Sequence, residues 1–129
     1  MINFFGKYKI IFYITNFILM LLYLFPGSLI GCYLYDDCKL QPKITPDFII
    51  STNHLYAFAF LSLIAFLTFK KTDKITLVNL YLIIISIVLE LFHHFIPERS
   101  FEYSDLFGNL IGVIIITIFF NLLKKYENS

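Results

Sequence analysis

The sequence predicts an all-α membrane protein: one four-helix transmembrane bundle with both termini in the cytoplasm. Two observations indicate this class, namely four apolar stretches joined by short polar segments, and lysines that gather on one side of those stretches. Hydrophobic residues make up 59% of the 129 residues and charged residues only 15%, whereas a soluble domain carries about a quarter charged residues. The formal net charge is +1. No basic patch offers a surface for nucleic acid, so we expect no nucleic-acid partner.

Each apolar stretch is close to the roughly 20 residues that a helix needs to cross the hydrocarbon layer. None alternates strictly between polar and apolar residues, which argues against a membrane barrel. Residues 1–129 form a single domain, and short joints before the third and fourth helices predict two helical hairpins. The first stretch is apolar up to Phe25 and continues past Pro26. We expect helices over residues 10–34, 48–69, 75–96 and 105–123.

The basic residues predict the orientation of the bundle. Seven lysines lie on one side of the four helices, and three basic residues lie on the other side. The seven are Lys7, Lys9, Lys70, Lys71, Lys74, Lys124 and Lys125, and the three are Lys39, Lys43 and Arg99. Because cytoplasmic loops carry the excess of Lys and Arg, both termini are expected inside the cell. The segments around residues 35–47 and 97–104 then face outside.

Two cysteines, Cys32 and Cys38, lie close together near the end of the first stretch. They can form a short disulfide if their loop faces an oxidising compartment, and two free thiols fit the sequence equally well. The string LIGC that ends at Cys32 also resembles a lipoprotein cleavage box, but the string PGS in front of it interrupts the apolar run. We therefore expect the first helix to be retained.

Three of the predicted helices bring polar side chains to a similar depth in the outer half of the membrane. At a rise of 1.5 Å per residue, His54 and Glu90 each lie about 9 Å inside the outer ends of their helices, and Asn109 lies about 6 Å inside. Glu90, His93 and His94 stand at i, i+3 and i+4, so they share one face of the third helix.

Glu90 is the residue that most needs an explanation, because a buried carboxylate costs several kcal/mol unless it is paired, protonated or hydrated. Ionisable residues inside a membrane mark functional sites by default. We therefore interpret Glu90, His54 and His93 as a candidate catalytic set that moves a proton. The alternative is a structural clasp, in which Glu90 bonds to a histidine or to Arg99 and only ties the helices together.

On the fourth helix, Asp105, Asn109 and Gly112 stand at i, i+4 and i+7 and share a face. The outer N-terminus of that helix carries the positive end of the helix dipole, and Arg99 lies in the adjoining loop. We interpret these three residues and Arg99 as a candidate binding set for an anionic head group. Gly112 lets another helix or a lipid approach closely.

Neither a metal site nor a cofactor is predicted. Glu90-x-x-His93 resembles half of a di-iron helix motif, but the second half is missing from the sequence. Two cysteines are too few for a structural zinc site, which needs four ligands. Asn16, in the first helix, is interpreted as an interhelical hydrogen-bonding residue rather than a ligand contact.

The strings ELFHHFIPER (residues 90–99) and SDLFGNLIG (residues 104–112) resemble the VanZ-like family. That family's pattern is Glu-x-x-Gln, Pro-x-Arg, then Asp-x-x-x-Asn-x-x-Gly. A histidine that opens the second helix and is followed by aromatic residues is also typical, and HLYAF, starting at His54, is similar to it. The resemblance covers about residues 53–120. His93 stands where the family has Gln, and Ile50-Ser51 stand where it has Asp-Lys.

The family's namesake confers low-level resistance to the glycopeptide antibiotic teicoplanin. The resemblance therefore implies a multi-pass protein of the bacterial inner (cytoplasmic) membrane that is connected with the cell envelope, but it implies no particular reaction. Its expected partners are membrane lipids and a lipid-linked envelope precursor at the extracytoplasmic face. The alternative is a non-enzymatic membrane scaffold or accessory subunit. A transporter is a third hypothesis, and it would need to form a homo-oligomer because four helices are few.

Overall fold

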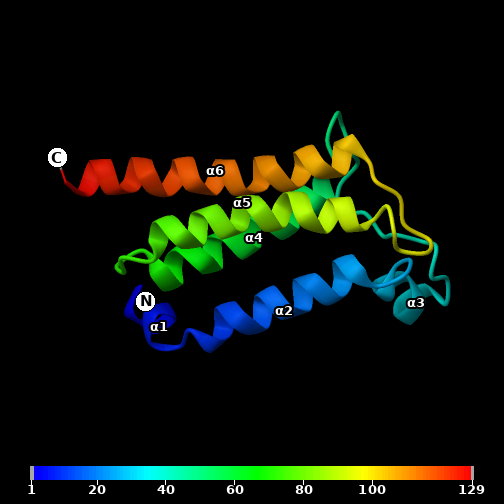
Figure 1. Cartoon of the computed structure of the whole chain (residues 1–129), viewed down its shortest axis with the longest axis horizontal. Helices are drawn as coiled ribbons and strands as arrows, with labels where there is room; N and C mark the ends of the chain where they lie inside the picture. Colours follow the sequence, from blue (N-terminus) through cyan, green and yellow to red (C-terminus); the bar gives the residue numbers. More distant parts are fainter. Residues whose placement is uncertain (1, 129) are drawn as a thin grey trace.

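The computed structural model of the chain describes residues 2–128, which form six α-helices and no strand. These are α1 (Ile2–Lys7), α2 (Ile10–Leu24), α3 (Leu29–Tyr35), α4 (Thr52–Phe69), α5 (Ile75–Phe92) and α6 (Tyr103–Glu127). In Figure 1, α2, α4, α5 and α6 run along one bundle. Both termini lie at one end of it, and α3 lies with the longer loops at the other end.

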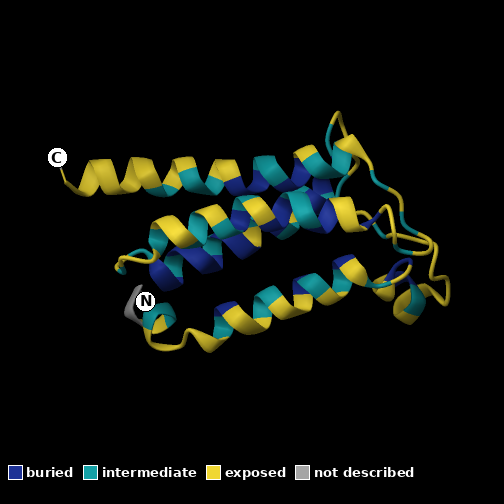
Figure 2. Cartoon of the chain, viewed as in Figure 1, coloured by how far each residue is buried: buried dark blue, intermediate teal, exposed yellow. Residues whose placement is uncertain are grey.

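α4 is the central helix of this bundle. Half of its residues are buried, compared with 28% in α5 and 22% in the most apolar part of α6. It packs against α6 most extensively, and also against α1, α2 and α5. Figure 2 shows buried residues concentrated on α4 and on the sides of α5 and α6 that face the bundle interior. Polar side chains on the inner face of α4 therefore meet other helices.

Two glycines allow α6 to approach α4 closely. A Cβ atom on Gly112 would lie 2.6 Å from the carbonyl oxygen of Leu55 and 2.9 Å from the amide nitrogen of Ala59. A Cβ atom on Gly108 would lie 2.6 Å from the carbonyl oxygen of Ser51. Small residues are what allow two helix backbones to touch in this way. The close approach predicted at Gly112 is thus made by a helix, and it leaves no space there for a lipid.

Three of the described helices are long and apolar enough to cross a membrane. Their most apolar stretches have mean hydropathies of 1.4 in α4, 2.4 in α5 and 2.3 in α6. α2 and α3 pass the same test only as a bent pair, which would give a fourth span. The all-helical class and the several membrane-spanning helices therefore agree with the prediction from the sequence.

The predicted continuous helix over residues 10–34 is wrong. The chain breaks between α2 and α3, and the axes of these two helices differ in direction by 81°. Pro26 has no N–H to continue the helical ladder, and Gly27 adopts a φ of 80°, which favours glycine. The new helix starts where the Ser28 hydroxyl accepts a hydrogen bond from the Gly31 N–H at 3.0 Å.

The other predicted helices differ from the structure only at their ends. α4 starts four residues later than predicted, where the Asp47 carboxylate accepts a hydrogen bond from the Thr52 N–H at 3.1 Å. α5 ends four residues earlier, at Phe92, because tighter i→i+3 turns lead into Pro97. α6 starts two residues earlier and ends four residues later than predicted, and α1 was not predicted at all.

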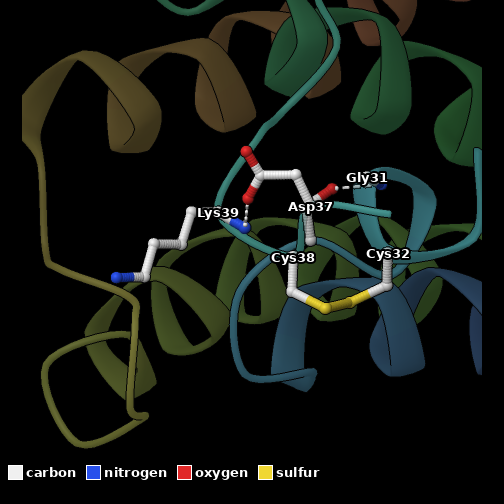
Figure 3. Close-up of a disulfide and its surroundings, with 6 residues drawn as sticks. Gly31, Cys32, Asp37, Cys38 and Lys39 are labelled. Atoms are coloured by element: carbon white, nitrogen blue, oxygen red, sulfur yellow. Dashed lines mark hydrogen bonds between the residues drawn. A yellow bond between two sulfur atoms is a disulfide. The ribbon is translucent and has the colours of Figure 1, made fainter. Parts of the chain in front are cut away.

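Cys32 and Cys38 form a disulfide at the end of the bundle opposite the termini (Figure 3). The bond joins α3 to the segment that follows it, and the two Cα atoms are 4.1 Å apart. Asp36 turns the chain back with a φ of 51°. The Lys39 N–H donates to Asp37 Oδ1 at 3.0 Å, which secures the turn. Of the two alternatives left open by the sequence, the structure has the disulfide.

Candidate functional site

Seven polar side chains gather at the end of the bundle that carries α3 and the disulfide. We call them the polar cluster. Its members are Tyr23, His54, Glu90, His93, Arg99, Asp105 and Asn109. Six of the seven predicted site residues belong to it: all three of the catalytic set and all of the ligand set except Gly112. They come from α2, α4, α5, α6 and the α5–α6 segment, so the fold assembles residues that are far apart in the sequence.

Asn109 is fully buried on α6 and connects three other helices. Its Nδ2 donates to the Ser86 carbonyl oxygen at 2.9 Å, so its Oδ1 points toward Tyr23 and His54. The Tyr23 hydroxyl donates to this Oδ1 at 2.8 Å. His54 Nδ1 lies 3.0 Å from both Oδ1 and the hydroxyl oxygen. An amide oxygen can only accept and the hydroxyl proton is already used, so the network assigns the hydrogen to His54 Nδ1.

His93 and Arg99 satisfy the carbonyl groups at the C-terminal end of α2. His93 Nε2 donates to the Tyr23 carbonyl oxygen at 2.9 Å. Arg99 donates to the Leu22 carbonyl at 2.9 Å and to the Phe25 carbonyl at 3.3 Å. The last carbonyls of a helix lack intrahelical partners, and a cation stabilises them. Arg99, predicted to bind a ligand beside the fourth helix, therefore has two of its donors committed to α2.

Glu90 is fully buried near the end of α5, and its two oxygens have different surroundings. Oε1 accepts a hydrogen bond from the Glu102 N–H at 3.2 Å. Oε2 lies 3.1 Å from His93 Nδ1 and 3.9 Å from His54 Nδ1, but forms no hydrogen bond of acceptable geometry. Glu90 lines neither of the two cavities beside the cluster. Contact between Glu90 and a molecule in those cavities is therefore not seen in this arrangement, and its catalytic role stays a prediction.

Asp105 faces His54 across the contact between α6 and α4. Its Oδ2 lies 3.7 Å from His54 Nε2. The start of α6 is therefore already surrounded by acidic groups, because the Glu90 carboxylate accepts from the Glu102 N–H and Asp105 lies in the first turn. These charges would repel an anion. The binding of an anionic group at the N-terminus of this helix stays a prediction, and these acidic groups disfavour it.

Two residues singled out in the sequence lie apart from the polar cluster. Gly112 packs against the backbone of α4, so no open space is left beside it for the ligand that it was predicted to bind. His94, which shares a helical face with Glu90 in the sequence pattern, lies beyond the end of α5 and is exposed. Asn16 accepts a hydrogen bond from the Tyr81 hydroxyl at 2.7 Å, which confirms the predicted interhelical contact.

Tyr23 is the member of the polar cluster that the sequence did not reveal. Besides its hydroxyl and carbonyl contacts, its ring stacks on that of His93, with centroids 5.7 Å apart and an interplanar angle of 16°. A tyrosine in an apolar stretch usually marks an interface anchor. The only available signal was its position three residues before Pro26, where the helix has to end.

Two cavities meet at the polar cluster. An apolar groove of about 550 Å³ lies between α2–α3 and α4, and a more polar cavity of about 320 Å³ lies beside it, under the loops that precede α4 and α6. Among the described residues, Lys43 and Arg99 are the only Lys, Arg, Asp or Glu side chains that line the groove. Its apolar wall includes Leu22, Leu29, Ile30, Ala57 and Phe60. The two cavities share Gln41, Lys43, Asn53, His54 and Arg99.

Two charged groups in the loops that precede α4 and α6 have shifted pKa values. Burial lowers the pKa of the Arg99 guanidinium from its ordinary value, and nearby acidic groups oppose that shift. The hydrogen bond from Lys43, whose Nζ lies 3.1 Å from the carboxylate, lowers the pKa of Asp47. An arginine starts from a pKa far above neutrality, and lowering a carboxyl pKa moves it further below neutrality. Both groups are therefore charged at neutral pH.

Comparison of the chain with models of known protein families, with curated proteins and with solved structures finds no match.

Proposed function

We propose that the chain is a VanZ-like protein that spans the bacterial cytoplasmic membrane four times and binds an anionic amphiphile of the cell envelope at the extracytoplasmic face. The place of the motif residues supports this proposal. Glu90, Arg99 and Asn109 belong to one sequence pattern, and in the structure they lie in the same polar cluster. Helix formation alone does not require a Glu, an Arg and an Asn at the same end of the bundle.

Two features support an outward-facing cluster and inward-facing termini. The disulfide holds α3, which lies at the end of the bundle opposite the termini (Figure 1), and disulfides persist in oxidising compartments outside the cytoplasm. Most lysines lie at the other end, with both termini, as cytoplasmic segments require. The proposed face is therefore the one at which envelope components are assembled.

α2 supplies the fourth span in this proposal. Its 15 residues cover about 22 Å at 1.5 Å per residue, somewhat less than the hydrocarbon layer. Tyr13, Phe17 and Leu21 are 55%, 62% and 51% exposed on it, as expected for side chains that face lipid. α3 turns away at the outer end, where an 81° bend would place it along the membrane surface.

The apolar groove is the observation that carries the proposal. Its wall suits a hydrocarbon chain, while its two charged residues, Lys43 and Arg99, are both cations and complement an anionic head group. The polar cavity beside it is lined by Asp47, Glu98, Glu102 and Asp105, so it offers hydrogen-bond acceptors to an uncharged or cationic part of the head rather than to the phosphate. The ligand that fits this pair of cavities is a phosphate-bearing lipid, the class to which lipid-linked envelope precursors belong.

Two histidines are placed to contact the head group. His54 lines both cavities, and His93 lines the polar one. Tyr23 and Asn109 hold the His54 ring in one orientation through the hydrogen bonds to Nδ1. Preorganised side chains of this kind favour a specific ligand pose, because the ligand does not have to order them.

A non-enzymatic membrane scaffold is the second candidate, and the hydrogen-bond network favours it. Asn109 alone joins α6 to α2, α4 and α5. Polar contacts between helices lock packing in membranes. Under this alternative the polar cluster only holds the bundle together, and no lipid stays bound in the groove.

Native mass spectrometry of the full chain, purified in mild detergent, separates the two candidates. Wild-type protein should retain one anionic lipid per chain. Ala57→Trp places an indole in the groove wall and should reduce the retained lipid by about tenfold, a change of about 1.4 kcal/mol. Ile84→Trp adds the same ring at a position that is 50% exposed and outside the groove, so it should leave retention unchanged.

The outcomes of this experiment are distinct. Equal lipid retention by Ala57→Trp and Ile84→Trp would contradict binding in the groove. Wild-type protein that carries no lipid, although it is folded and in a single oligomeric state, would favour the scaffold.

A further inference from the structure

We propose that His54, Glu90 and Asp105 form a binding site for one divalent transition-metal ion, with Zn²⁺ as the fitting ion. One nitrogen of His54 and one carboxylate oxygen from each of the other two residues lie within 4.8 Å of one another. Zinc–nitrogen and zinc–oxygen bonds of about 2.0–2.2 Å place neighbouring ligand atoms about 3–4 Å apart. The three donors, from α4, α5 and α6, are thus already close to the spacing that an ion requires.

The orientation of the His54 ring is the first support for this site. Because Nδ1 carries the hydrogen and points to Asn109, the lone pair of the neutral ring is on Nε2. That atom faces Asp105 Oδ2 at 3.7 Å, a spacing suited to two ligands of one ion, while Glu90 Oε2 lies 3.9 Å from Nδ1 of the same ring. A lone pair that faces an ionised carboxylate is repelled unless a proton or a metal ion lies between them. Histidines that bind metals almost always donate their other ring N–H to an acceptor, as His54 does here.

Glu90 provides an independent second support. Its side chain is fully buried, and its Oε2 has no hydrogen-bond donor with suitable geometry. A buried carboxylate oxygen without a partner is costly. A metal ion would provide that partner, while the Glu102 N–H continues to hold Oε1. Two carboxylates would also neutralise both charges of the ion, which matters in a region that contains little water.

The donor set decides the class of ion. A nitrogen ligand favours zinc and its neighbours in the first transition row, whereas magnesium and calcium prefer oxygen ligands throughout. His54 and Asp105 line the polar cavity, which gives the ion a route from the outside. Three protein ligands leave a further coordination position open toward that cavity.

This inference goes beyond the proposed lipid binding and does not depend on it. The sequence did not predict a metal site because the second Glu-x-x-His pair is missing from it. In the structure the three ligands instead come one from each of three helices. Residues so far apart in the chain leave no short sequence motif by which the site could be recognised.

Zinc binding by the full chain in detergent tests the proposal without any lipid. Protein treated with a chelator and then desalted is titrated calorimetrically with Zn²⁺, and the retained zinc is measured by elemental analysis. Wild type should bind one ion per chain. Asp105→Asn and His54→Gln should lower the affinity by more than about 100-fold, since loss of an outer-shell partner alone costs 10–100-fold. His94→Gln changes an exposed histidine and should bind as wild type does.

X-ray absorption at the zinc edge of the wild-type complex is a second readout, which stands even if a variant fails to fold. It should show one imidazole and otherwise oxygen ligands. The proposal is overturned if wild type retains no zinc, if the spectrum lacks the imidazole, or if folded Asp105→Asn and His54→Gln bind zinc as tightly as His94→Gln. Preference for Mg²⁺ over Zn²⁺ would overturn the assigned ligand chemistry.

Discussion

The two ends of the bundle are built from the same helices but are held together by different forces. At the end that carries α3 and the disulfide, hydrogen bonds made by Asn109 join α6 to α2, α4 and α5. At the end that carries the termini, aromatic rings make the contacts. Phe66 stacks on Phe120 at 5.2 Å, and Phe12 meets Phe69 edge to face at 5.3 Å.

This difference matters because the solvent around a membrane protein is itself apolar. Lipid tails compete with apolar contacts between helices, so aromatic packing has no strong preference for one exact arrangement. A buried polar group finds no substitute partner in hydrocarbon, and each unsatisfied group costs free energy. The geometry at the end with α3 is therefore fixed by hydrogen bonds, while the end with the termini tolerates substitutions that preserve side-chain volume.

The largest effect expected from this comparison is that of Asn109→Leu. The change removes the acceptor for Tyr23 and His54 and leaves their polar groups buried. We expect the free energy of unfolding to fall by about 3 kcal/mol, from buried groups that cost about 1–3 kcal/mol each. Phe66→Leu is the matched apolar change at the other end and should cost about 1 kcal/mol. Denaturant titration in micelles measures both, and equal losses would contradict the comparison.

Gly112→Ala should have the next largest effect. The added methyl group would press on the backbone of α4, with 2.6 Å to the nearest carbonyl oxygen, so we expect a loss of about 2 kcal/mol. Gly6→Ala is the control at the opposite end, where the nearest atom would be 3.9 Å away. Thermal unfolding should show a lower midpoint for Gly112→Ala alone. A normal midpoint would mean that the two helices separate at little cost.

Glu90→Gln should cost less, about 1 kcal/mol, and should leave the protein in the membrane. The amide oxygen can still accept from the Glu102 N–H, and the amide N–H can donate to His93 Nδ1. Unfolding in micelles measures the change. A loss well above 3 kcal/mol, restored when another hydrogen-bonded pair is built at this place, would favour the scaffold over a binding site.

Asp47→Asn should give the smallest effect, a few tenths of a kcal/mol, because the Lys43–Asp47 pair is exposed and screened. The folded pKa of Asp47 is lowered from 3.8, chiefly by the hydrogen bond from Lys43. Its contribution is therefore complete above the unfolded pKa and is lost as the pH falls through the folded value. Wild type should show this loss below about pH 4, and Asp47→Asn should lack it. An identical acid profile for both proteins would exclude the contribution.

Much of the fold could be predicted from the sequence because span length is a simple physical constraint. The apolar stretches that became α4, α5 and α6 were each recognised by length, and only their ends were misplaced. The sharp bend between α2 and α3 was missed, although Pro26 was visible. A membrane helix can continue, kink or end at a proline, so Pro26 alone does not predict a bend. The bend also depends on the backbone conformation of Gly27 and on the helix cap made by Ser28.

The sequence predicted most of the residues that gather in the polar cluster, but not the contacts that they make with one another. Depth along each helix placed His54, Glu90 and Asn109 at one level, which requires only the rise per residue. The donors of Arg99 could not be assigned in the same way, because the carbonyls that it binds belong to α2, more than 70 residues away in the chain. Tyr23 was missed for the same reason: an interhelical contact leaves no local pattern.

The most direct test of the account is to find where an anionic lipid with a photoreactive acyl chain labels the protein. Such a lipid, with a phosphate head, is incubated with the full chain in liposomes, crosslinked by light and mapped by peptide mass spectrometry. If the groove binds the lipid, labels should concentrate on the groove wall at Ala57 and Phe60, decrease in Ala57→Trp, and be few on the exposed Ile84 and Ile115. Labels spread evenly over the lipid-facing residues, and unchanged in Ala57→Trp, would contradict binding in the groove.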